Sequence, residues 1–196
     1  MIEESTRSDL KESHRFSGRK QKTVTRTFRI KTEWDEVLKQ EAEKQGTSVN
    51  VLVNSILQKY VSFDRWAQGH NSICLTQQTF HKILSGITDE NLALAGEKSG
   101  STDIQNMLDM IGLPSNYDSF SYMLSTHLGG ANRAMWFTCC RHTQENSDIF
   151  HLQHKLGRGW SIFLEKYLHS HLKTLKIKGE TRVYDYAVNL KIPRPY

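Results

Sequence analysis

The sequence predicts an α+β protein built from two domains. An alternating, strand-like segment at residues 23–30 is followed by two short amphipathic helices, and together they make a first domain over residues 22–62. Residues 71–196 carry several helical patterns, and then strand-like segments around one long apolar helix, as expected for a second α+β domain. The stretch from Ser62 to Asn71 follows neither period, so it is the expected boundary between the domains.

Composition favours a protein of the cytoplasm. The chain has 196 residues, of which 37% are hydrophobic, and no apolar run approaches the roughly 20 residues that span a bilayer. The polar N-terminus lacks the apolar stretch of a secretory signal. Three cysteines make no disulfide framework. We therefore expect a cytoplasmic protein with no membrane partner.

Cations are concentrated near the N-terminus. The net charge of +5 is modest, but no carboxylate occurs between His14 and Thr32. The cations in that stretch are Arg15, Arg19, Lys20, Lys22, Arg26, Arg29 and Lys31. This density suits a polyanionic partner. Residues 1–21 by themselves are typical of a flexible basic arm.

The segment from Thr23 to Ile30 predicts a strand that needs a second chain. With period two, its apolar side chains and Arg26 point one way, and Thr25, Thr27 and Arg29 point the other. A single strand cannot satisfy its own backbone donors and acceptors, so antiparallel pairing with a second copy is the natural completion. We therefore expect a homodimer.

Two helices follow this strand. Thr32 is expected to cap the first, which Gly46 ends, and Ser48 is expected to cap the second. The apolar positions are Trp34, Val37, Leu38 and Ala42 in the first helix and Val49, Leu52, Val53, Ile56, Leu57, Tyr60 and Val61 in the second. This is more apolar surface than one small subunit can bury, which again indicates a symmetric partner.

The order of strand, helix, Gly46 and a Ser48-Val49-Asn50 helix start resembles the ribbon-helix-helix domain of the Arc, MetJ and CopG repressors. The resemblance covers residues 22–62. It implies that paired strands enter the DNA major groove, with Thr25, Thr27 and Arg29 as base readers.

The same resemblance implies a set of phosphate contacts. These would come from Lys20, Lys22, Arg26, Lys31 and the helix start at Ser48, Val49 and Asn50. Arg26 departs from the family pattern, in which an apolar residue usually stands at this inward position. Its cation would reach solvent or phosphate with its stem lying along the apolar surface.

Residues 71–196 predict a mixed second domain. The expected elements are a strand at 73–75, helices around 80–84, 88–95, 104–111 and 118–128, strands at 134–141 and 148–154, a helix over 160–175, and a strand at 182–190. Chain breaks are expected at Lys98–Gly100, and helix caps at Thr102 and Asp118. This order is compatible with a ferredoxin-like or ACT-like sandwich with an enlarged first crossover.

The proposed hairpin of this domain carries candidate metal ligands. They are Cys139, Cys140, His142, His151 and His154. Neighbours along a strand point to opposite faces, so at most one subset of the five can converge. Their spacing does not match that of the nickel-responsive regulators, which share this general plan. His171 lies on the apolar stripe and is expected to be a hydrogen-bonded core residue.

These patterns predict a sequence-specific transcriptional regulator that binds double-stranded DNA as a homodimer, or as a tetramer, near the nucleoid. The second domain, residues 71–196, would sense an unknown effector or drive oligomerisation. We expect no enzyme activity and no cofactor. The alternatives are an antitoxin-like protein whose remaining chain captures a partner, and a metal-responsive regulator.

Overall fold

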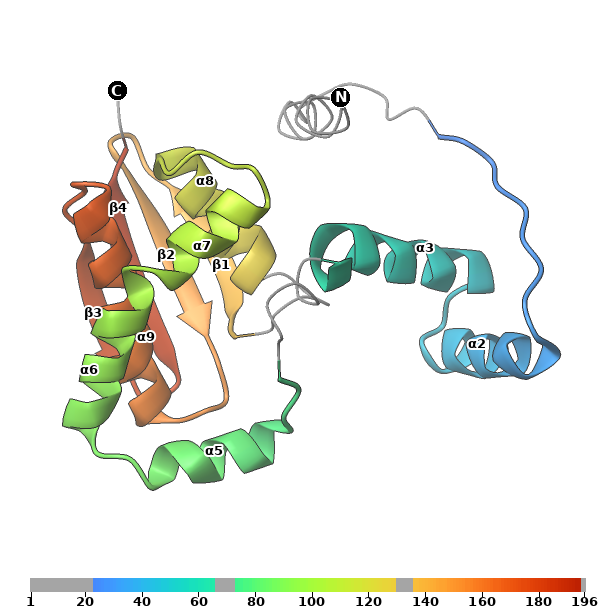
Figure 1. The fold of residues 1–196 in the computed structure, drawn as a ribbon, viewed down its shortest axis with the longest axis horizontal. Coiled ribbons are helices and arrows are strands. Elements are labelled where there is room, and N and C mark those ends of the chain that lie inside the picture. The colour runs from blue at the N-terminus through green and yellow to red at the C-terminus, as the bar shows by residue number, and fades with distance from the viewer. Residues whose placement is uncertain (1–22, 66–72, 130–135, 195–196) are drawn as a thin grey trace. The chain divides into compact units, whose positions relative to one another are not determined.

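The computed structural model describes residues 23–65, 73–129 and 136–194. The chain divides into two compact units, residues 1–62 and residues 63–196, each described here by itself. In the described residues, helices accompany one four-stranded antiparallel sheet, which confirms the α+β class (Figure 1).

The first unit contains two helices, α2 (Thr32–Lys44) and α3 (Val49–Lys59), preceded by residues 23–31, which have no regular secondary structure in the single chain. Gly46 has a φ of 61°, a left-handed conformation that ends α2 without side-chain strain. Ser48 caps α3 as expected, because its hydroxyl accepts a hydrogen bond from the amide of Val51 at 3.3 Å. The expected cap at Thr32 is wrong: Lys31 holds the N-cap position and no side chain caps α2.

A π-helical turn, η1 (Tyr60–Asp64), continues α3. The helices of the second unit are α5 (Gln77–Ser85), α6 (Asp89–Gly100), α7 (Asp103–Met110), α8 (Tyr117–Tyr122), its π-helical continuation η3 (Met123–Leu128), and α9 (Arg158–Thr174). The strands are β1 (Thr138–Thr143), β2 (Ser147–Gln153), β3 (Glu180–Tyr184) and β4 (Ala187–Pro193). The expected hairpin of β1 and β2 is confirmed.

Two expected strands are wrong, and with them the ferredoxin-like topology. Residues 73–76 are not a strand, and the expected last strand is a hairpin of β3 and β4 that turns at Asp185 and Tyr186. The sheet order is β1-β2-β4-β3 and every neighbouring pair is antiparallel. The described part of the second unit therefore runs from helices into two hairpins that flank α9, with no strand ahead of the helices.

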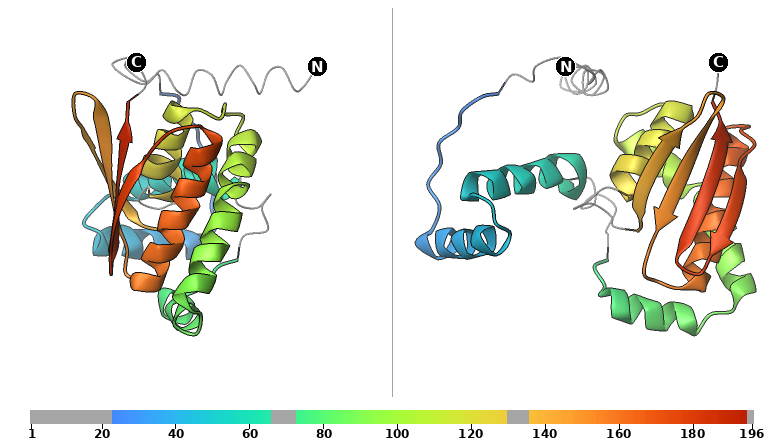
Figure 2. Two further views of the ribbon diagram at one scale, coloured as in Figure 1. Left: turned by 90° about the vertical axis from the view of Figure 1, so that its left-hand side faces the viewer. Right: turned by 180° about the vertical axis from the view of Figure 1, so that it is seen from behind.

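The helices of the second unit lie on one face of the sheet, which Figure 2 shows nearly edge-on in its left panel. Alternation along the strands turns apolar side chains toward these helices. They include Phe150 and Leu152 from β2 and Val188, Leu190 and Ile192 from β4, all fully buried. The opposite face, called the open face below, carries no helix of the described part of this unit.

The expected apolar stripe of the long helix is confirmed, since α9 supplies much of the core. Its fully or nearly fully buried side chains are Trp160, Leu164, Tyr167, Leu168, His171 and Leu172. The rings of Trp160 and Phe163 stack with centroids 4.8 Å apart. One continuous core therefore joins α9 to the sheet and to the other helices.

The break expected at Lys98–Gly100 lies just after these residues, because α6 includes them, ends at Gly100 and has Ser101 at its C-cap position. Gly96 and Gly100 lie four residues apart against α9, and both are buried. A β-carbon at Gly100 would collide with the carbonyl oxygen of Tyr167, and one at Gly96 with that of Phe163. Here glycine allows two helix backbones to touch.

One expected cap is wrong, and a second holds its position without the expected hydrogen bond. Asn116 caps α8, because its side chain accepts a hydrogen bond from the Ser119 amide at 2.9 Å, and Asp118 lies inside the first turn. Thr102 holds the N-cap position of α7 without a capping hydrogen bond. Its hydroxyl contacts the Ser99 carbonyl oxygen at 3.4 Å instead. The Thr102 side chain thus satisfies a different local group.

Candidate functional site

The segment expected to read DNA is fully solvent-facing. Residues 23–30 are all exposed, including Thr25, Thr27, Arg29 and the cation Arg26. Within the described chain, no backbone group of residues 23–30 makes a backbone hydrogen bond. Among the described residues, the donors and acceptors of this extended segment (Figure 1) are left for another chain or for solvent.

Apolar side chains of this unit are also exposed. Phe28 is 59% exposed, Trp34 55% and Leu57 50%. The other large apolar side chains exposed in this unit are Val24, Ile30, Val37, Val51, Ile56, Tyr60 and Val61. Among its described hydrophobic residues, Ala42 and Leu52 alone are buried. The single chain therefore leaves most of the stripes predicted for α2 and α3 uncovered.

The expected phosphate contacts lie in two places. Ser48, Val49 and Asn50 form the first turn of α3, where amides not used inside the helix point outward. The Lys31 ammonium lies over the Trp34 ring, 5.3 Å from its centroid, at the start of α2. Lys20 and Lys22 lie outside the described residues.

The five candidate metal ligands separate onto two faces. Cys140, His142 and His151 lie on the open face of the sheet, whereas Cys139 is on the helix side. Burial raises the pKa of the Cys139 thiol to about 12, which disfavours the thiolate that binds metals. His154 follows β2, and its Nε2 lies 2.8 Å from the Ser161 hydroxyl. Burial lowers its pKa to about 4.

This separation limits what the hairpin can bind. Within the described ranges, no group of three or more His, Cys, Asp or Glu side chains is arranged to hold a metal ion. The full five-residue set is therefore excluded by strand alternation, as the sequence indicates. The remaining pair of imidazoles, His142 and His151, is considered below.

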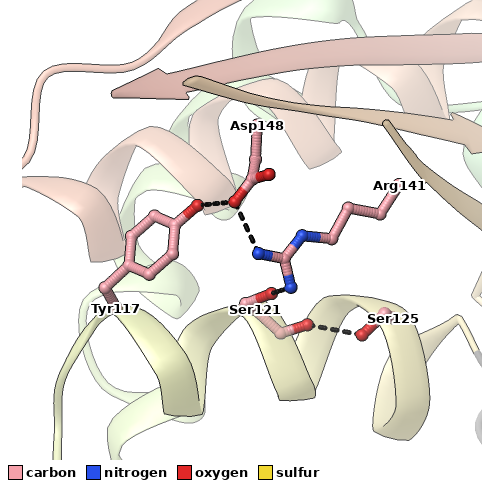
Figure 3. Close-up of polar contacts among 5 residues, drawn as sticks. All are labelled: Tyr117, Ser121, Ser125, Arg141 and Asp148. Carbon is pink, nitrogen blue, oxygen red and sulfur yellow. Dashed lines mark hydrogen bonds and ion pairs between the residues drawn. The ribbon is translucent and has the colours of Figure 1, made fainter. Parts of the chain in front are cut away.

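A polar cluster between α8 and the β1–β2 hairpin was not predicted from the sequence. Figure 3 shows Asp148 of β2 accepting on one oxygen, Oδ2, from both Tyr117 and Arg141. Arg141 Nη2 lies 2.6 Å from that oxygen, and Arg141 Nη1 donates to the Ser121 hydroxyl at 2.8 Å. Ser125 donates to the Ser121 carbonyl oxygen at 2.7 Å. The cluster ties α8 and η3 to the β1–β2 hairpin.

The cluster keeps a fully buried carboxylate ionised. Burial acts to raise the pKa of Asp148, but hydrogen bonds from Arg141, Tyr117 and Thr143 outweigh it, so the net pKa is lowered. Burial, and then the hydrogen bond to Asp148, raises the pKa of the Tyr117 hydroxyl. The Arg141 side chain is 36% exposed, so one edge of this otherwise buried group meets solvent. The arrangement positions secondary structure.

One signal in the sequence could have revealed this cluster. Asp148 shares its strand face with Phe150 and Leu152, so period-two alternation places a carboxylate among core side chains. A carboxylate in that position needs a buried partner. Arg141 lies on the same face of the paired strand, opposite Phe150 and diagonal to Asp148.

An open groove runs beside α6 and α9. It is lined by Glu97, Glu165, Lys166, His169, Ser170 and Lys173. Lys173 lies 3.1 Å from Glu97, and Thr181 donates to Glu165 at 2.9 Å. These charges pair mainly with each other, which is typical of a solvated helix surface.

Comparisons of the chain with models of protein families, with curated proteins and with solved structures found no match. In the described ranges, none of the helices combines the length and the apolar character needed to cross a membrane.

Proposed function

We propose that the protein is a homodimeric, sequence-specific DNA-binding regulator in which residues 23–31 of two chains pair as a β-ribbon. The observation that supports the proposal is that the first unit, as a single chain, has neither strand pairing nor a covered apolar surface among its described residues. Its extended segment makes no backbone hydrogen bond within the described residues, and its two helices expose the apolar residues that a partner would cover. A second copy would supply both the missing strand and the missing half of the core.

In the paired arrangement one ribbon face meets the DNA. Thr25, Thr27 and Arg29 share the face opposite Phe28 and Ile30, so covering the apolar face leaves these three outside. The major groove is wide enough for a two-stranded ribbon. Arg29 can donate two hydrogen bonds to guanine, and threonine offers a hydroxyl and a methyl group.

The start of α3 would hold the DNA backbone. Its amides at Val49 and Asn50, capped by Ser48, favour an anion. Lys31 and Arg26 would add phosphate neutralisation and a strong salt dependence. These contacts position the dimer, and the ribbon supplies the sequence preference.

The second unit supports a regulator over an antitoxin-like protein. It has its own core, including the fully buried Phe120, Leu124, Phe150 and Leu168. A segment that captures a toxin by folding on binding would lack such a core in the free chain. The second unit would then sense an effector or assemble dimers.

The test begins with the full chain and a random duplex library, from which bound sequences are selected. Arg29→Ala should lose roughly 1 to 3 kcal/mol of discrimination between selected and scrambled duplexes, measured by fluorescence anisotropy. Arg26→Ala is the matched variant from the other face of the ribbon. It should weaken both duplexes equally and reduce the salt slope by about one.

Two results would reject this proposal. One is a wild-type chain that enriches no sequence from the library. The other is an Arg29→Ala variant that discriminates as well as the wild type does.

A further inference from the structure

The open face of the sheet carries a row of polar side chains that crosses all four strands. The strand register places Cys140 opposite His151, His151 opposite Asn189, and Asn189 opposite Arg182. His142 is two residues after Cys140 on the same face, diagonal to His151. No described helix of this unit covers these groups.

The two imidazoles of this face lie at the separation that a shared metal ion requires. The ring centroids of His142 and His151 are 5.2 Å apart, with the rings at 76°. A tetrahedral ion with metal–nitrogen bonds of about 2 Å would place two imidazole centroids about 5 Å apart. The pair therefore needs only side-chain rotation to aim one nitrogen of each ring at a common point.

Asn189 orients one of these rings. Its Oδ1 lies 2.7 Å from His151 Nδ1, so an amide oxygen accepts the Nδ1 proton and leaves the Nε2 lone pair free. Histidine ligands are commonly fixed in this way by a hydrogen bond at the other ring nitrogen. In the described part of the chain, no hydrogen-bond partner is found for His142, so its nitrogens are also open to a ligand.

We propose that His142 and His151 form a binding site for a divalent late transition-metal ion, of the Zn²⁺ and Ni²⁺ class, with Asn189 as a positioning residue. Imidazole nitrogen is a favoured ligand for these ions, whereas Mg²⁺ and Ca²⁺ prefer oxygen. Two protein ligands are in place rather than three, and water completes the coordination. The site lies in the second unit and does not depend on the proposed DNA binding.

The test uses the full-length, tag-free chain after treatment with a chelator. Titration with Ni²⁺ or Zn²⁺, followed by calorimetry at neutral pH, should show one saturable ion per chain. His142→Ala and His151→Ala should each weaken binding at least tenfold, and Asn189→Leu about tenfold to a hundredfold. The matched control, His81→Ala, removes an exposed imidazole of α5 and should leave the affinity unchanged.

A second readout does not rely on affinity. Paramagnetic Ni²⁺ should broaden the imidazole NMR signals of His142 and His151 first and leave that of His81 sharp. The circular dichroism spectrum of each variant checks that it is folded. The proposal is overturned if the wild-type chain takes up no ion, or if a folded His142→Ala/His151→Ala double variant binds the ion as tightly as the wild type does.

Discussion

Individual buried polar side chains of the second unit differ in whether they have partners. Asp148 is fully buried, but Tyr117 and Arg141 hydrogen-bond its Oδ2. His171 is equally buried and stacks on Phe120 with ring centroids 5.4 Å apart. In the described residues, neither ring nitrogen of His171 has a hydrogen-bond partner. His171 is therefore a core residue, as expected, but the expected hydrogen bond to it is absent from the described residues.

The unpartnered imidazole of His171 predicts a loss of stability in mild acid. Burial lowers its pKa from 6.5 to about 4, so between these values the unfolded chain binds a proton that the folded chain does not. The His171 contribution to the free energy of unfolding should then fall by about 3 kcal/mol as the pH drops through this window. Urea unfolding followed by tryptophan fluorescence near pH 7 and near pH 4 measures the change.

His171→Leu isolates this effect. It removes two unpartnered nitrogens, so the variant should lose less stability on acidification than the wild type. His154, whose pKa burial also lowers to about 4, remains in the variant and contributes to the same window. His81→Leu alters an exposed imidazole and serves as control. An acid dependence unchanged by His171→Leu would contradict the prediction.

At the scale of elements, two glycine residues of α6 illustrate close packing. Because Gly100 and Gly96 touch the backbone of α9, Gly100→Ala should destabilise the second unit by roughly 1 to 3 kcal/mol or more. The matched control is Gly86→Ala at the end of α5, where the nearest atom would be 3.5 Å away and φ is −88°. That change should be neutral or stabilising by up to about 1 kcal/mol. Thermal unfolding compares the two, and equal effects would refute the packing argument.

How well the sequence predicted each element depended on where its stabilising contacts lie. The stripe of α9 and the β1–β2 hairpin follow from local periodicity, and both were predicted. The role of Gly100 depends on a partner distant in the chain, whereas the β3–β4 hairpin is local and was missed because its turn signal is weak. A β-carbon at Gly100, the last residue of α6, would collide with the carbonyl oxygen of Tyr167, and the local sequence does not show this contact. In the Asp185–Tyr186 turn, Asp185 is of a type common in turns, but no glycine or proline stands beside it and the segment reads as one strand.

The candidate site shows the same division. Alternation along β1 and β2 correctly indicated that the five metal-ligand candidates could not all converge. It could not supply the position of Asn189, which belongs to a strand 38 residues away from His151. The tie between Asp148 and Tyr117 spans 31 residues and was missed for the same reason. Alternation along a strand predicts which face of the sheet a side chain lies on. It does not predict which residue from a distant part of the chain contacts that side chain.

At the scale of the whole molecule, the two units differ in how they can be stable. The second unit has an extensive core of its own, whereas α2 and α3 are short helices with little buried surface. Isolated helices of 13 and 11 residues are marginal in water. The first unit should therefore gain its stability from association.

We accordingly expect two thermal unfolding transitions in the full chain. Only the midpoint temperature of the first unit's transition should rise with protein concentration. Sedimentation over roughly 1 to 100 μM should show a dimer. Leu57→Glu, which places a charge on the uncovered face of α3, should give a monomer and abolish the concentration dependence. Leu94→Glu is the matched control, because Leu94 of α6 is 49% exposed and Leu57 50%. If Leu94→Glu dissociates the dimer and Leu57→Glu does not, the contact between chains lies in the second unit. That result would contradict dimerisation through the first unit.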